Sequence, residues 1–539
     1  MSDTIYHNAR VYTVNDDQPW AEAIHVRDGK ILAIGSSAEV LKAAGNAQTI
    51  DLAGRMVMPG IHDAHSHLIW AARRQLEHSC QLDDPQTLDE LAAQLRAYWH
   101  KRGDKHGGKH GHKHADRGWL FGSVYNPLVF TADVLTRQWL DDVLPGVPIV
   151  IHDFSYHNVM ANSLALAAAG IDRDTPSTPR GTVVKDAVSG EPTGVLREQA
   201  WAPLYMVAPE FTAQENALAL HKAAAICNAY GITSVQEASA NRPFLAAAKC
   251  LDDAGNLNLN LTCHIPWGSL ILAQCERDEQ ERVIAERAQY AGKRVNVNAI
   301  KVALDGTSMA PTFSHVPLDP HTDVPITYNL LLDSDELSAK IREWTADGMI
   351  VKSHCTGYGS VRIGLDNYER ASSVERKPGQ MHDIAHAHYV SNADRERFAE
   401  LGVIAEMSPA IWHIPEYQEA LGRAYDFRTL HAHGATMTVG SDWLLPPTPN
   451  LFPALAGMLE HGDESVPLSV GVRMLTHNGA IAVGRSAQCG SLEPGKDATF
   501  IVLDRNIFEA SPEQIAGTQV LTTVLQGQRV FERNQACQA

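Results

Sequence analysis

Two histidines, His65 and His67, are the residues of this chain whose type and spacing are best suited to chemistry. They stand in the run His62-Asp-Ala-His-Ser-His67, directly after an apolar stretch that ends Met58-Pro59-Gly60. If 61–68 is a strand, both side chains point to the same side of it. Two imidazoles on one face form half of a divalent metal site. Because the chain has 26 histidines, such pairs also arise by chance, so this interpretation needs further ligands.

Further candidate ligands follow at the ends of later apolar segments, in the order Lys301, His354, His386 and Asp442. Neutral imidazoles and a carboxylate are ordinary ligands of zinc or a similar divalent ion. A protonated lysine cannot bind a metal. Burial beside cations would lower the pKa of Lys301, and the neutral amine could then add carbon dioxide to form a carbamate that bridges two metals. An ion pair, or a contact with a substrate carboxylate, is the alternative role for Lys301.

Eight apolar segments separated by helical stretches would position these residues. The segments are 61–68, 231–237, 258–265, 297–304, 349–354, 382–388, 402–407 and 436–441. This pattern predicts an α/β fold, a closed (β/α)8 TIM-like barrel with its catalytic residues at the carboxyl ends of the strands. Thr212 to Glu215 predicts a capping box, and the helix it opens is expected to end at Gly231.

Both ends of the chain consist of short strands with polar turns. We expect residues 1–57 and 482–539 to form one small β-sandwich domain, and residues 58–481 to form the barrel. Residues 75–205 are too long for one connection and predict a lid-like insertion after the first barrel strand. Five histidines fall within 100–114 of this insertion, which indicates either a metal-scavenging tract or a solvated loop.

The composition narrows the choice of partners and compartment. The formal charge of −18 argues against binding to nucleic acid or anionic membranes. No uninterrupted apolar stretch is long enough to span a membrane, and the first residues lack a secretory signal. The eight cysteines are scattered without a Cys-x-x-Cys pair, which suits reduced thiols in the cytoplasm. A homodimer is the expected assembly.

Several motifs in order along the chain resemble one family. They are Met58-Pro-Gly-Ile-His-Asp-Ala-His-Ser-His-Leu68, Asn162-Ser-Leu-Ala-Leu166, Gly190-Glu-Pro-Thr-Gly-Val-Leu-Arg-Glu198, Gly231-Ile-Thr-Ser-Val235, Ile300-Lys-Val-Ala-Leu-Asp-Gly306, Gly440-Ser-Asp442, Leu475-Thr-His-Asn-Gly-Ala480 and Gly490-Ser-Leu-Glu-Pro-Gly-Lys-Asp-Ala498. The chain resembles the metal-dependent amidohydrolases. Within them it is most similar to amidohydrolase family 3, the branch with N-substituted formamide deformylases and YtcJ-like proteins.

The resemblance implies a role for each candidate ligand. One metal would be held by His65, His67 and Asp442, a second by His354 and His386, and a carboxylated Lys301 would bridge them. Zinc, as one or two ions, is the implied cofactor.

Two segments depart from the family pattern. Ala385 stands where the family usually has glutamate, and the stretch 352–358 lacks its usual acidic residue. His386 is preferred as the ligand over His388 and over His382, which lie on the same predicted strand.

The implied activity is hydrolysis of a C–N bond in a small amide, N-acyl or N-formyl substrate. A divalent ion lowers the pKa of bound water from about 16 to about 7, and Asp442 would shuttle the proton from this water to the departing amine. His157, Asp305 and His388 are candidate substrate contacts, although a structural role is open for each. Deamination, hydrolysis of cyclic amides and a non-catalytic role as a ligand-binding regulator are the alternatives.

Overall fold

The barrel strands form one parallel sheet in the computed structural model, which describes residues 3–533 apart from 44, 77–78, 105–117, 132–133, 179, 414–420 and 422–423. The strands are β8 (Ile61–Ser66), β15 (Ile232–Glu237), β16 (Asn260–Pro266), β17 (Val295–Ala303), β18 (Ile350–Cys355), β19 (Asp383–His386), β20 (Ile404–Met407) and β21 (Met437–Val439). They lie side by side in chain order, and a parallel bridge from Ser66 to Trp443 closes β21 onto β8. The predicted eight-stranded barrel is therefore confirmed.

Apolar side chains explain why these segments form strands. β8, β15, β16 and β19 are buried along their whole length, as expected for parallel strands covered on both faces. The ends of all eight strands lie within two residues of the predicted ends. The strand ends could be predicted this closely because each continuous apolar run is flanked by polar turns.

Helices cover the outside of the barrel. They include α7 (Ala213–Ala229), α8 (Arg242–Asp253), α11 (Ser334–Ala346), α12 (Tyr358–Ala371) and α16 (Phe452–Leu459). Helix α7 begins with the predicted capping box, in which Thr212 accepts from the Glu215 amide and the Glu215 carboxylate accepts from the Thr212 amide. The helix is followed by Gly231 at a φ of +77°, a conformation that favours glycine.

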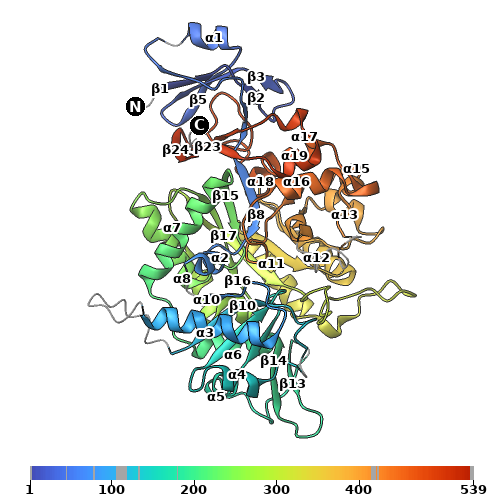
Figure 1. Ribbon diagram of the computed structural model, residues 1–539. Coiled ribbons are helices and arrows are strands. Elements are labelled where there is room, and N and C mark those ends of the chain that lie inside the picture. Colours follow the sequence, from blue (N-terminus) through green and yellow to red (C-terminus); the bar gives the residue numbers. More distant parts are fainter. Residues whose placement is uncertain are drawn as a thin grey trace.

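Both ends of the chain meet in two further sheets. One contains β5-β4-β1-β6, and the other has the order β24-β23-β22-β7-β2-β3 and so joins strands from opposite ends of the sequence. Their strands are β1 (Asp3–His7), β2 (Arg10–Tyr12), β3 (Trp20–Ala21), β4 (Ala23–Arg27), β5 (Lys30–Gly35), β6 (Gln48–Asp51), β7 (Met56–Pro59), β22 (Phe500–Leu503), β23 (Val520–Leu525) and β24 (Gln528–Glu532). The N- and C-terminal parts lie together at one end of the molecule (Figure 1). Residues such as Val11, Ile24, Val57 and Phe500 pack between these sheets.

The segment between β8 and β15 carries a sheet of its own, of order β13-β14-β12-β11-β10-β9. Its strands are β9 (Cys80–Gln81), β10 (Leu120–Tyr125), β11 (Ile149–Asp153), β12 (Asn158–Ala161), β13 (Gly181–Lys185) and β14 (Pro192–Glu198). Helices α3 (Leu88–Asp104), α4 (Arg137–Val143), α5 (Ser163–Ala168) and α6 (Ala202–Val207) accompany it. This part lies at the end of the barrel opposite the terminal sheets (Figure 1). Most of the histidine-rich segment 100–114 lies outside the described residues.

None of the described helices is both long and apolar enough to cross a membrane. The homodimer and the cytoplasmic location stay predictions.

Candidate metal centre

Closure of the barrel brings the first and last strands together around three candidate ligands. His65 lies within β8, and His67 follows that strand at the start of helix α2 (Leu68–Gln75). Asp442 follows β21 at a φ of +48°, and its amide donates to the carbonyl of His65 at 2.8 Å. A non-glycine residue at positive φ is uncommon and is found preferentially at functional sites. The backbone therefore aims the Asp442 carboxylate at the two histidines.

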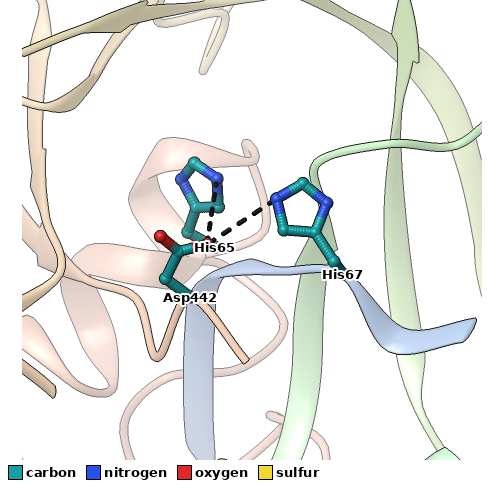
Figure 2. Close-up of side chains that lie close together, drawn as sticks. All are labelled: His65, His67 and Asp442. Atoms are coloured by element: carbon teal, nitrogen blue, oxygen red, sulfur yellow. Dashed lines mark ion pairs between the residues drawn. The ribbon is translucent and has the colours of Figure 1, made fainter. Parts of the chain in front are cut away.

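The donor atoms of these three residues converge (Figure 2). Asp442 Oδ1 lies 3.9 Å from His65 Nε2 and 3.6 Å from His67 Nε2. One ligand atom from each residue can be chosen so that all three lie within 4.8 Å of one another. Tetrahedral zinc with bonds of 2.0–2.2 Å separates its ligand atoms by roughly 3.3–3.6 Å. The spacing and the donor types therefore fit a divalent ion such as zinc.

The protonation of both imidazoles also fits metal binding. His65 Nδ1 donates to Glu406 Oε2 at 2.7 Å, and His67 Nδ1 contacts Ser239 Oγ at 2.9 Å. These partners leave both Nε2 atoms available on the side of Asp442. Burial lowers the pKa of His67 to about 3 and that of His65 well below its usual value, with Lys301 adding to both shifts. The rings are therefore neutral, which is the form that binds a metal.

Lys301 on β17 lies against this cluster, with Nζ 3.3 Å from His65 Nε2. Its side chain is only 1% exposed. Burial, and then the neighbouring ammonium of Lys352, lower the pKa of Lys301 to about 8. A neutral amine is therefore accessible near neutral pH, as carbamate formation requires.

The next two candidate ligands lie on β18 and β19. The ring of His386 is 4.6 Å from that of His65 and 4.4 Å from that of His354, measured between centroids. His354 Nε2 donates to the Gly306 carbonyl at 2.9 Å, so its Nδ1 is the nitrogen available for a metal. His65, His386 and His354 thus form a continuous row of imidazoles at the mouth of the barrel.

His388 and His382 compete with His386 in the sequence, and the structure separates the three. His388 is 5.5 Å from His386 between ring centroids and lines the same cavity. His382 accepts from the Val351 amide, contacts Thr345 Oγ1 and stacks on Tyr368. Both nitrogens of His382 are therefore used within the fold, and the ring does not line the cavity.

A network of buried charges supports the histidine row, and sequence reasoning missed it. Glu406 on β20 contacts His65 and also accepts from Ser408 Oγ at 3.0 Å. The ammonium of Lys352 lies 2.8 Å from Asp383 Oδ2, 3.9 Å from Glu406 Oε2 and 2.8 Å from the Ala64 carbonyl. Burial raises the pKa of Glu406, and Lys352 opposes this rise. The sequence does hint at this network, because β18, β19 and β20 each carry a charged residue (Lys352, Asp383 and Glu406) in an apolar strand.

Asp63 is a second residue that sequence reasoning missed. It accepts from the His65 amide at 3.1 Å, from the Ser441 amide at 2.8 Å and from Ser441 Oγ at 2.6 Å. Asp63 thereby ties β8 to the residue before Asp442. Glu237, which accepts from the Leu68 amide and from Ser239, fixes the loop beside His67 in the same way.

Two of the predicted substrate contacts differ in their surroundings. His157 Nδ1 lies 3.0 Å from both carboxylate oxygens of Glu198, and both residues line the cavity. Asp305 also lines the cavity, but its oxygens accept from the amides of Val316, Thr356 and Gly357, each at 3.0 Å. The oxygens of Asp305 hold the loop before α12, which agrees with the structural role that the sequence left open for this residue.

A cavity of about 140 Å³ lies over the row of imidazoles. The insertion contributes part of its wall, including Tyr156, His157 and Trp201, so it covers the mouth of the barrel. The aromatic residues Trp119, Tyr125, Phe130 and Trp412 pack in apolar clusters and do not line this cavity.

A (β/α)8 barrel with a His-His-Asp cluster at the carboxyl ends of its strands is suited to an enzyme that binds a divalent metal. The amidohydrolase family model matches residues 48–531, and the chain belongs to the amidohydrolase family.

Relatives match the chain over nearly its whole length. YtcJ of Bacillus subtilis (strain 168) is 27% identical, covering 98% of this chain and 99% of YtcJ. An N-substituted formamide deformylase of Arthrobacter pascens is also 27% identical, covering 99% of each chain. An uncharacterized metal-dependent hydrolase of Pyrococcus horikoshii OT3 superposes with a TM-score of 0.71 at 21% identity, covering 95% of this chain and 99% of that one. This structural likeness supports the fold.

Proposed function

We propose that the protein hydrolyses the C–N bond of a small linear amide, N-acyl or N-formyl compound with a divalent metal, most simply Zn²⁺. One observation carries the proposal: two neutral imidazoles and a carboxylate converge where the barrel closes. The similarity to an N-substituted formamide deformylase favours the N-formyl end of this range.

His65, His67 and Asp442 would hold the first metal. A carbamate on Lys301 would link it to a second, held by His354 and His386. Bound there, a divalent ion lowers the pKa of water to about 7 and polarises a carbonyl. Lys301 is suited to the bridging role because its amine is buried and lies 3.3 Å from a ligand atom of His65.

Asp442 would move the proton. Burial raises the pKa of Asp442 to about 6, close enough to neutrality for one carboxyl to accept a proton and release it again. It would take a proton from the attacking water and give it to the nitrogen of the departing amine. This transfer matters because an unprotonated amine is a poor leaving group.

His157 would bind the substrate. Burial disfavours its charged form, but the carboxylate of Glu198 outweighs that effect and raises the pKa of His157. With Nδ1 held by Glu198, Nε2 remains for a substrate oxygen in the cavity. His388, whose Nε2 has no partner among the described residues, is a second candidate contact.

Metal analysis combined with a panel of amides tests the proposal. We expect one or two divalent ions per chain, release of an amine and a carboxylic acid, loss of activity with a chelator and recovery with added Zn²⁺. Release of ammonia from ring amidines would instead indicate a deaminase, and ring opening would indicate a cyclic amide hydrolase. A metal-free, fully stable protein that is inert toward every amide would overturn the proposal in favour of a ligand-binding role.

A further inference from the structure

A second cavity adjoins the one over the imidazole row. Its volume is about 310 Å³, and Trp70, Tyr156 and Leu444 line both cavities. Its remaining wall comes from the insertion, from α2 and from the loops around α8 and α9 (Leu270–Ala273). The shared lining residues place the larger space directly beside the candidate metal centre.

Arg74 provides an uncompensated positive charge in this second cavity. Its guanidinium donates to the Leu444 carbonyl and lies 5.8 Å from the centre of the Tyr156 ring. Among the residues that the structure describes, no carboxylate forms an ion pair with Arg74. By contrast, Arg242 in the same wall lies 2.6 Å from Glu279 and 3.6 Å from Glu286. A half-buried guanidinium without a counter-charge is a ready partner for an anion.

His152 is an independent sign of a ligand at this place. It lines the second cavity and is only 3% exposed. Its Nε2 lies 2.6 Å from the Tyr205 hydroxyl, whereas Nδ1 has no hydrogen-bond partner within the described ranges. A buried polar atom is normally paired, so an unpaired one in a cavity wall points to a missing ligand.

The rest of the wall suits an apolar or aromatic group. Tyr205 stacks on Trp70, with ring centroids 5.9 Å apart, and packs against Phe121 at 5.1 Å. Cavities of about 300 Å³ or more are large enough for small organic ligands. The walls therefore combine an aromatic surface with the guanidinium of Arg74, while Arg242 in the same wall is paired with Glu279.

We propose that the second cavity is a subsite for the far end of the substrate, and that Arg74 there binds a carboxylate carried on an apolar or aromatic arm. This inference rests on the proposed amide hydrolysis. Arg74 follows His67 by seven residues, which is roughly 10 Å along helix α2. The carboxylate is therefore separated from the scissile bond by a spacer, and the smaller cavity at the metal centre takes the amide with a short acyl group.

A matched pair of formamides tests the subsite. 4-(Formamidomethyl)benzoate has a carboxylate across an aromatic spacer, and N-(4-methylbenzyl)formamide is its neutral counterpart. In the wild-type protein we expect kcat/KM to favour the acid by at least about tenfold. R74M should lower the ratio of kcat/KM for the acid to that for the neutral compound about 10- to 100-fold, because it removes a hydrogen-bonded charge pair. R74K should retain part of the preference for the acid.

R242M is the matched control, because it removes a guanidinium from the same wall while Glu279 keeps Arg282 as a partner at 2.8 Å. The ratio should stay within about threefold in R242M. A ratio that R74M leaves unchanged, or that R242M lowers equally, overturns the subsite.

A binding measurement separates this inference from the proposed function. 4-Methylbenzoate has no scissile bond, so its affinity can be measured by calorimetry even if neither formamide is hydrolysed. Binding to the wild-type protein that weakens at least about tenfold in R74M supports the subsite. Equal affinity for the two proteins overturns it, whether or not the protein is an amidase.

Discussion

Replacing Glu406 with glutamine should weaken the metal centre although every proposed ligand remains. Glu406 is fully buried, and its Oε2 lies 2.7 Å from Nδ1 of His65. This contact fixes the ring and keeps the proton on Nδ1, so that Nε2 can bind the metal. A divalent ion on His65 would also stabilise the charged form of Glu406, because opposite charges favour ionisation. Glutamine has nearly the same shape but cannot ionise.

The hydrogen bond between His65 and Glu406 determines the size of the effect. A hydrogen bond to a charged group contributes about 1.5–3 kcal/mol and is roughly twice as strong as a neutral one. The glutamine oxygen can still accept from His65, so about half of this energy is lost, which corresponds to about 3- to 10-fold in metal affinity. Lys352 keeps Asp383 at 2.8 Å, so no buried ammonium is left unpaired. We therefore expect a stability loss of about 1–2 kcal/mol, smaller than the 3–5 kcal/mol of a broken buried pair.

Competition with a chromogenic chelator measures zinc affinity, and circular dichroism checks that each variant is folded. D394N is the control, because Asp394 is a fully buried carboxylate that binds Arg362 and Arg397 and does not line the cavity. Both variants should be less stable than the wild type, but only E406Q should bind zinc more weakly. Zinc affinity within twofold of the wild type in E406Q, or an equal loss in D394N, would refute the role given to Glu406.

Three further perturbations probe the centre. K301A should lose the binuclear metal content and regain part of it with added short carboxylates; unchanged metal stoichiometry by elemental analysis would show that Lys301 is no bridge. D442N should abolish turnover while metal stays bound, and near-wild-type rates would contradict the proton shuttle. E198Q should cost more stability at pH 6 than at pH 9, because Glu198 raises the pKa of His157 and such a group loses its contribution as pH rises through that pKa. Urea unfolding between pH 6 and pH 9 measures this difference, and a loss of stability that does not change with pH would count against an ion pair between Glu198 and His157.

The barrel and the order of its candidate ligands could be predicted because both depend on local features. Each strand is an apolar run bounded by polar turns. Parallel strands bring their carboxyl ends to one face whatever their exact register. His65, Lys301, His354 and Asp442 could therefore be grouped before any geometry was known. The choice between His386 and His388 as the ligand was harder to predict. β19 ends at His386, and His386 and Ala387 have φ values of +69° and +39°. Side chains after His386 therefore do not alternate between the two faces as they would in a regular strand.

The supporting residues could not be predicted because their partners are distant in the chain. Glu406 and His65 are 341 positions apart, and Asp63 and Ser441 are 378 apart. Such contacts depend on how strands are staggered around the barrel, and apolar patterning does not encode the stagger. An acidic residue in an apolar strand does predict a buried hydrogen-bond or ion-pair contact, because a buried carboxylate needs a partner. The sequence does not identify that partner.

The candidate metal centre lies where the first and last strands of the barrel meet. The eight strands pair in order from β21 to β8, and a bridge from Ser66 to Trp443 joins the two ends of this sheet. Two further links join the strands: the Asp442 amide donates to the His65 carbonyl, and the Asp63 side chain accepts from Ser441. A metal held by His65, His67 and Asp442 would add a further link across this junction. The ligands that would activate water therefore also complete the barrel, so metal binding and closure of the barrel should stabilise each other.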